Sequence, residues 1–129
     1  GWQDMWKPPG GEPQIQDYLR LFLTEVNRGR LSLDRLVRIT SYNPARLFGV
    51  YPRKGVIQVG SDADLVLIDL EKEETIENKT TYTKVGWTPY DGRRVKGVPV
   101  MTFVRGKVVM ENGVVTGKPG DGTFIPPVK

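Results

Sequence analysis

The sequence of 129 residues contains no histidine and no cysteine. Without cysteine, the chain has no disulfide framework, no thiolate nucleophile and no cysteine-bound metal. Without histidine, a Ser-His-Asp or Cys-His nucleophile is excluded by composition. Zinc in hydrolases is held mainly by imidazole and thiolate groups, so we expect no catalytic zinc site inside this chain.

Long apolar runs are also missing. No stretch approaches the roughly 20 apolar residues that span a bilayer, and the amino terminus lacks a signal-peptide pattern. We therefore predict no membrane partner and, because the absence of cysteine suits a reducing compartment, a cytoplasmic location. The chain starts at Gly1 in a segment that opens no regular element, which we interpret as a cut in a longer polypeptide.

Charge of one sign is not concentrated anywhere. The net charge of +4 arises from 19 basic and 15 acidic residues scattered along the chain. The short basic pairs Arg53-Lys54 and Arg93-Arg94 have no interleaved aromatic platform for bases to stack on. We predict no nucleic-acid partner.

The first part of the chain, from residue 14 to 49, has helical character. Apolar residues recur at the helical period over residues 15–30, and Gly29 can end that helix in the left-handed conformation. Ser32 is a candidate N-cap for a short second helix. We expect an interruption at residues 40–42, because Asn43-Pro44 is typical of a fresh helix start.

The second part, from residue 53 to 116, has strand character. We expect a short extended piece at Val56–Val59 and a strand at 63–70, whose four consecutive apolar residues, Leu65 to Ile68, predict burial on both faces. Residues 71–75 look like a charged rim after that strand.

A meander of three strands is expected after residue 94. Pro99 predicts a break or an edge within the first of them, since proline cannot donate to a ladder. Asn112-Gly113 is a strong hairpin signal because a type I′ turn needs positive φ at both central positions.

Several short motifs, in this order, resemble one known family. They are Gly29-Arg30-Leu31-Ser32-Leu33, Asn43-Pro44-Ala45 through Gly49, Tyr51-Pro52-Arg53-Lys54-Gly55, Gly60-Ser61-Asp62-Ala63-Asp64, Thr88-Pro89-Tyr90-Asp91-Gly92 and Val104-Arg105-Gly106-Lys107-Val108-Val109. The chain thereby resembles the cyclic amidohydrolases: dihydroorotases, hydantoinases or dihydropyrimidinases, and allantoinases.

The resemblance implies an α+β fragment of a larger fold. Residues 1–52 would be the end of a (β/α)₈ catalytic barrel, comprising the loop after strand eight and the closing helices. Residues 53–129 would supply the carboxy-terminal strands of a small β-sandwich. The tail from Gly117 would contact a neighbouring subunit, which predicts a homo-oligomer, and the remainder of the barrel would be a further partner.

The resemblance also places the metal chemistry elsewhere. It implies one or two zinc ions and a carboxylated lysine on earlier strands, together with an aspartate ending strand eight. We assign no catalytic and no metal-binding residue in this chain, and Asp4 does not qualify because nothing like a strand precedes it. Asp62 and Asp64 are expected to accept hydrogen bonds from backbone donors rather than to bind calcium.

The best candidates for contact with substrate are Pro9, Gly10 and Gly11. In the family, the corresponding loop over the barrel mouth touches the substrate, and glycines permit close backbone approach. The alternative is a plain connection before a helix.

Three functions stay open. The leading one is the carboxy-terminal portion of an enzyme that hydrolyses a small cyclic amide, inactive alone. A second is a non-catalytic, dihydropyrimidinase-related assembly protein, and a third is an independent α+β binding module. Within the first, the identity of the ring is open, because the motifs point to dihydroorotase, allantoinase and hydantoinase alike.

Overall fold

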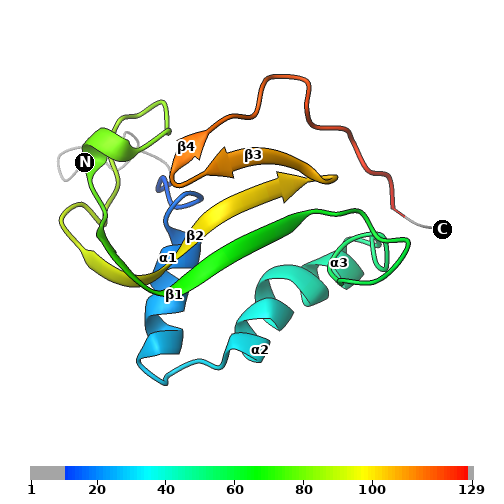
Figure 1. Ribbon diagram of the computed structural model, residues 1–129, viewed down its shortest axis with the longest axis horizontal. Helices are drawn as coiled ribbons and strands as arrows, with labels where there is room; N and C mark the ends of the chain where they lie inside the picture. Colours follow the sequence, from blue (N-terminus) through cyan, green and yellow to red (C-terminus); the bar gives the residue numbers. More distant parts are fainter. Residues whose placement is uncertain (1–10, 128–129) are drawn as a thin grey trace, which may run out of the picture.

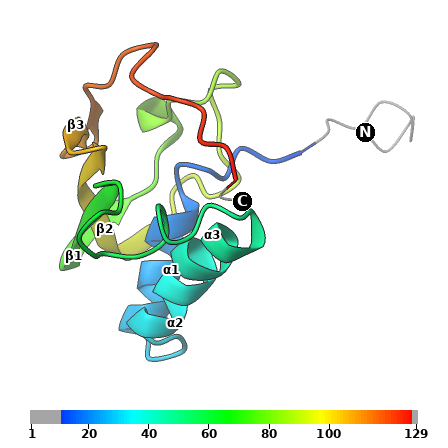
Figure 2. The same cartoon turned by 90° about the vertical axis from the view of Figure 1, so that its right-hand side faces the viewer.

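The computed structural model describes residues 11–127 and has two layers. A four-stranded antiparallel sheet, in the order β1-β2-β3-β4, forms one layer. Three helices lie on the same side of it (Figures 1 and 2). The elements are α1 (Tyr18–Asn27), α2 (Leu33–Val37), a π-helical turn (Arg38–Tyr42), α3 (Asn43–Leu47), β1 (Leu65–Thr75), a 3₁₀ turn (Asn78–Thr80), β2 (Arg94–Val104), β3 (Lys107–Glu111) and β4 (Val114–Val115).

Helix α1 packs closely on the central strand β2. A Cβ on Gly97 would lie 2.8 Å from the Cβ of Leu23, so only glycine allows this approach. Leu23 is completely buried. The helix starts at Tyr18, after a turn, and Gly29 follows its end with φ 70°, which confirms the expected left-handed position.

The second helical segment runs on without the expected interruption. Ser32 is its N-cap, as predicted, accepting a hydrogen bond from the Arg35 amide at 3.1 Å. Residues 38–42 form a π-helical turn, and Asn43 is itself helical rather than a cap. Pro44 has no amide hydrogen, and its ring would clash with the carbonyl four residues earlier in an α-helix. The wider turn relieves that clash while keeping the chain helical.

Two tight turns set the register of the sheet. Asn112 and Gly113 have φ values of 48° and 81°, and this turn joins β3 to β4, which confirms the predicted hairpin. Arg105 and Gly106, with φ values of 48° and 80°, join β2 to β3 in the same way. The meander β2-β3-β4 is therefore as expected.

Strand β1 is longer than predicted. The residues expected as a charged rim, 71–75, continue the strand because Glu73 to Thr75 pair with β2, while a bulge separates Asp69 from Glu73. The expected break at Pro99 is a second irregularity, where the register shifts between Leu67 and Ile68. The extended piece expected at 56–59 is a bend and turn instead.

The core lies between α1 and β2. Ile76, Val95 and Val98 are buried together, with Leu21 and Tyr90 against them. The predicted burial of β1 on both faces is not observed among the described residues, since Val66 and Leu67 are 46% and 52% exposed. Between residues 11 and 127, no helix has the length and apolarity needed to cross a bilayer.

Candidate functional site

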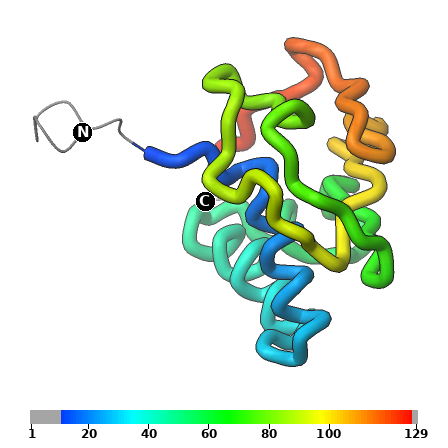
Figure 3. The backbone as a smooth tube through the Cα atoms, turned by 90° about the vertical axis from the view of Figure 1, so that its left-hand side faces the viewer, coloured from blue at the N-terminus to red at the C-terminus, as the bar shows by residue number. Residues whose placement is uncertain are grey.

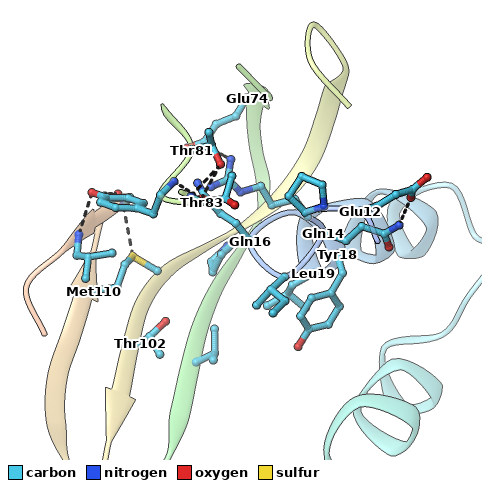
Figure 4. A pocket seen from close by; sticks show the side chains of 18 residues that line it. Glu12, Gln14, Gln16, Tyr18, Leu19, Glu74, Thr81, Thr83, Thr102 and Met110 are labelled. Atoms are coloured by element: carbon cyan, nitrogen blue, oxygen red, sulfur yellow. Dashed lines mark hydrogen bonds and ion pairs between the residues drawn. The ribbon is translucent and has the colours of Figure 1, made fainter. Parts of the chain in front are cut away.

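A hollow with a volume of about 650 Å³ opens on the helical side of the sheet (Figure 4). We call it the sheet-face pocket. A row of cross-strand partners crosses its lining, namely Val66, Thr102, Met110 and Val115, and Glu74 and Pro99 of the sheet line it as well. The walls are the segment from Glu12 to Arg20 and the loop at residues 81–83. Polar and apolar residues both line this space, which is bounded by three separate parts of the chain, and most of the surface they expose to it is apolar.

Gln16 fixes one wall of the sheet-face pocket. Its Nε2 donates to the Thr80 carbonyl at 3.0 Å, and its Oε1 accepts from the Tyr82 amide at 2.8 Å. Residues 78–83 are thus held beside the start of α1, although they lie far apart in sequence (Figure 3). The Tyr82 hydroxyl accepts from the Val115 amide and donates to the Gly113 carbonyl, both at 3.2 Å. This network joins the helix, the loop and the β3–β4 hairpin.

A charged pair lines the sheet-face pocket. Arg20 Nη1 lies 3.7 Å from Glu74 Oε2, and the Arg20 side chain is only 12% exposed. The Arg20 Nε is buried without a hydrogen-bond partner among the described residues. The pair gives the pocket charge of both signs.

The second hollow, of about 520 Å³, lies between β1 and the segment containing α2 and α3. We call it the edge groove. Its walls are largely apolar, and its lining residues on β1 are Leu65, Val66 and Ile68. On the opposite side are Leu33, Val37, Phe48 and Ile57, among others.

A cluster of four charged groups stands at one end of the edge groove. Lys54 Nζ lies 2.9 Å from Asp62 Oδ2 and also contacts Asp64, while Arg53 Nε donates to Asp62 at 2.9 Å. The hydrogen bond from Lys54, helped by Arg53, holds the pKa of Asp62 below its ordinary value. Burial lowers the pKa of Lys54, but hydrogen bonds to Asp64 and Asp62 outweigh it and hold that pKa above the ordinary value.

The predicted role of the two aspartates is half right. Asp64 Oδ1 accepts from the backbone amide of Arg105 at 2.7 Å, as expected of a turn before a strand. Asp62 instead accepts from the side chains of Arg53 and Lys54. Sequence reasoning missed these cations as partners, because a lysine eight residues upstream carries no local signal of where the loop will bring it.

The donor atoms do not fit the zinc ions that the family resemblance implies. Among residues 11–127, no three histidine, cysteine, aspartate or glutamate side chains gather where they could hold one metal ion. Histidine and cysteine are absent from the whole sequence.

The predicted substrate-contact residues fall at the margin of the structure. Pro9 and Gly10 lie outside the described residues. Gly11 is exposed with φ 78°, and a Cβ placed on it would meet nothing within 4 Å. Neither hollow includes Gly11 in its lining.

Comparison with known proteins gives consistent matches. The model of the Amidohydrolase family matches residues 13–109. The chain is 45% identical over 126 residues to an L-hydantoinase of Paenarthrobacter aurescens, covering 97% of this chain and 28% of that protein. It is 44% identical over 117 residues to a dihydroorotase of Pyrococcus abyssi, covering 91% of this chain and 28% of that protein. The crystal structure of a dihydropyrimidinase from Brevibacillus agri superimposes with a TM-score of 0.92 at 38% identity, covering 98% of this chain and 28% of that one. The chain thus spans little more than a quarter of the length of these relatives.

Proposed function

The chain belongs to the amidohydrolase family, and from this we propose that it is the carboxy-terminal part of a metal-dependent enzyme that hydrolyses a ring amide C–N bond. The family expected from the sequence motifs is confirmed. The observation that carries the proposal is the continuous similarity to L-hydantoinase across 97% of the chain.

The proposed substrate class is a cyclic ureide, a ring in which an amide bond is part of a urea unit. Relatives named hydantoinase and relatives named dihydroorotase match at 45% and 44% identity. Hydantoin and dihydroorotate share that ring chemistry, so the class follows from both sets of names.

The chain's own contribution in such an enzyme is structural and positional. We propose that residues 1–52 close the barrel and that 53–129 belong to the β-sandwich. Pro9, Gly10 and Gly11 would contact substrate, and the tail from Gly117 would contact a neighbouring subunit. Zinc, when bound, would activate water for attack on the amide carbonyl. Its ligands lie outside this chain, so we derive no step through it.

The proposal is tested by reading the gene upstream and assaying the longer polypeptide. A His-x-His pair followed by a lysine, two histidines and an aspartate is expected. The purified protein should open hydantoin, dihydrouracil, dihydroorotate or allantoin, and a chelator should abolish the activity. Residues 1–129 alone should hydrolyse none of them. Turnover by that chain alone, or a longer polypeptide that has the ligands but opens no ring, contradicts the proposal; loss of the ligands indicates an assembly protein.

A further inference from the structure

The loop that joins β1 to β2, residues 76–93, is braced both at its base and within. At the base, the Ile76 amide donates to the Arg93 carbonyl at 2.9 Å. Inside the loop, the Asn78 amide donates to Asp91 Oδ1 at 2.7 Å. Because these bonds join the two sides of the loop, it is a firm support that moves with the sheet.

Two adjacent residues before α1 bind this β1–β2 loop. Gln16 Nε2 donates to the Thr80 carbonyl at 3.0 Å, and Gln16 Oε1 accepts from the Tyr82 amide at 2.8 Å (Figure 4). Asp17 Oδ2 accepts from Thr88 Oγ1 at 2.6 Å, and Asp17 makes no side-chain cap bond to α1. The start of the helical segment is therefore fixed to the β1–β2 loop.

The stretch from residue 11 to residue 16 is short and restrained. Pro13 fixes one φ angle within it. The amides of Asp17 and Tyr18 both donate to the Gln14 carbonyl at 2.9 Å, which forms a turn directly before α1. Few conformations are open to such a stretch, so a displacement at one end is passed to the other.

We propose that Gln16 is a positioning residue for the hydrolysis: by fixing the start of the helical segment to the β1–β2 loop, it holds Gly11 where the ring substrate binds. This role rests on the proposed function, in which Gly11 contacts the substrate. Gln16 acts through Gly11, because both ends of its own amide bind the loop. The sheet thereby contributes to substrate binding without touching the substrate.

Gln16 can be altered at less cost to the fold than its neighbour Asp17. Asp17 and Thr88 are 3% and 4% exposed, so loss of their hydrogen bond leaves a buried carboxylate oxygen without that donor. Gln16 is only half-buried, and water can replace its bonds to the loop. A Gln16 variant therefore tests position more than stability.

Gln16→Met keeps the size of the side chain and removes both hydrogen bonds. A misplaced Gly11 weakens binding of the ring in the ground state and the transition state alike. The variant should therefore raise KM by about tenfold and change kcat by less than about twofold. Gln16→Glu keeps the oxygen that accepts from the Tyr82 amide and should recover more than half of the loss. The measurement is steady-state hydrolysis by the longer polypeptide of the cyclic ureide that it opens.

Asn27 provides the matched control, because it binds the other end of α1 to the sheet. Its Nδ2 donates to the Leu70 and Lys96 carbonyls at 3.0 and 3.1 Å. Asn27→Leu also removes side-chain amide bonds between helix and sheet, but far along the chain from Gly11. It should lower the melting temperature by an amount similar to that of Gln16→Met and leave KM within about twofold of its original value.

Equal rises of KM in Gln16→Met and Asn27→Leu overturn the positioning role, because general loss of stability would then explain both. An unchanged KM in Gln16→Met overturns it as well. If Gln16→Met does not fold, Gln16→Asn, whose side chain is one methylene too short to make the same bonds, takes its place in the comparison.

Amide hydrogen exchange separates the positioning role from the proposed function. In Gln16→Met, the amides of Asp17 and Tyr18 should exchange about tenfold faster, whereas Asn27→Leu should leave them unchanged. A polypeptide that shows this pattern but opens no cyclic ureide removes the proposed function and keeps Gln16 as the residue that fixes the turn. An active hydrolase in which Gln16→Met changes neither KM nor this exchange keeps the proposed function and removes the positioning role.

Discussion

Lys54 and Asp62, eight positions apart in the sequence, face each other across a loop, with 2.9 Å between Nζ and Oδ2. The loop closes further through the Asp62 amide, which donates to the Arg53 carbonyl at 2.9 Å, and the Ser61 hydroxyl, which donates to the Pro52 carbonyl at 2.7 Å. The connection between helices and sheet is therefore held by side chains and backbone together.

This ion pair should make stability depend on acidity. The folded-state pKa of Asp62 is below its ordinary value of 3.8. The ionised carboxylate therefore contributes to the free energy of unfolding above pH 3.8, and this contribution is lost as the pH falls through the folded-state pKa. Asp62→Asn should remove this contribution, flattening the fall of melting temperature below about pH 4. Thermal melts of both proteins across this range are the measurement.

Asp34→Asn is the matched control for that experiment. Asp34 also pairs with an arginine at 2.9 Å, but both side chains are more than half exposed. Ion pairs between exposed side chains contribute little to the free energy of unfolding. If Asp34→Asn flattens the fall of melting temperature at acidic pH as much as Asp62→Asn does, the ion pair of Lys54 and Asp62 has no special role in stability.

Gly97 should not tolerate a side chain. In Gly97→Ala, the new Cβ would lie 2.8 Å from Leu23 Cβ and 3.1 Å from Asn27 Nδ2, at a φ of 91°. Overpacking and backbone strain together should lower the free energy of unfolding by about 3 kcal/mol. Gly92→Ala, at φ 76° with nothing within 4 Å, should cost about 1 kcal/mol. Denaturant unfolding that gives the two variants similar losses contradicts the close contact of α1 with β2.

Thr88 should be required for its hydroxyl. It donates from Oγ1 to Asp17 Oδ2 at 2.6 Å, and both residues are buried. Thr88→Val keeps the shape but leaves the Asp17 oxygen without that donor, and should cost about 2 kcal/mol. Thr88→Ser keeps the hydroxyl and should recover more than half of the loss in a denaturant titration. Equal losses in both variants indicate that the methyl group matters rather than the hydrogen bond.

Tyr82→Phe should loosen one hairpin locally. The hydroxyl accepts from the Val115 amide and donates to the Gly113 carbonyl. Its removal should cost about 1 kcal/mol and speed exchange of the Val115 amide while leaving amides of β2 unchanged. If amide exchange becomes faster uniformly through the sheet, the hydroxyl of Tyr82 does not act locally.

Two features that depend only on neighbouring residues were predicted correctly, although the equally local signal at Asn43-Pro44 was not. The Ser32 cap and the Asn112-Gly113 turn need only a side chain or a backbone conformation within a few residues. Features that depend on a distant partner were not. Glu73 belongs to a strand because Lys96 pairs with it, and residues 56–59 form no strand because no partner lies beside them in the described chain.

The same distinction explains the candidate site. The sheet-face pocket arises where Val66, Thr102, Met110 and Val115 meet across four strands, a row that depends on register and not on any local motif. Pro9 and Gly10, which were chosen through the family resemblance, stay predictions outside the described residues.

The π-helical turn at residues 38–42 changes the phase of its helix. Leu36 and Ala45 are both buried, at 2% and 4% exposure, yet nine residues of regular α-helix would put them about 180° apart. The wider turn absorbs one extra residue and brings their directions to within about 80°. Ala45 can then face Gly55, where an added Cβ would come within 2.4 Å of it. Deleting one residue between 38 and 42 should leave a regular α-helix with this same relative direction, whereas inserting one more residue should rotate α3 by about 100° off the contact.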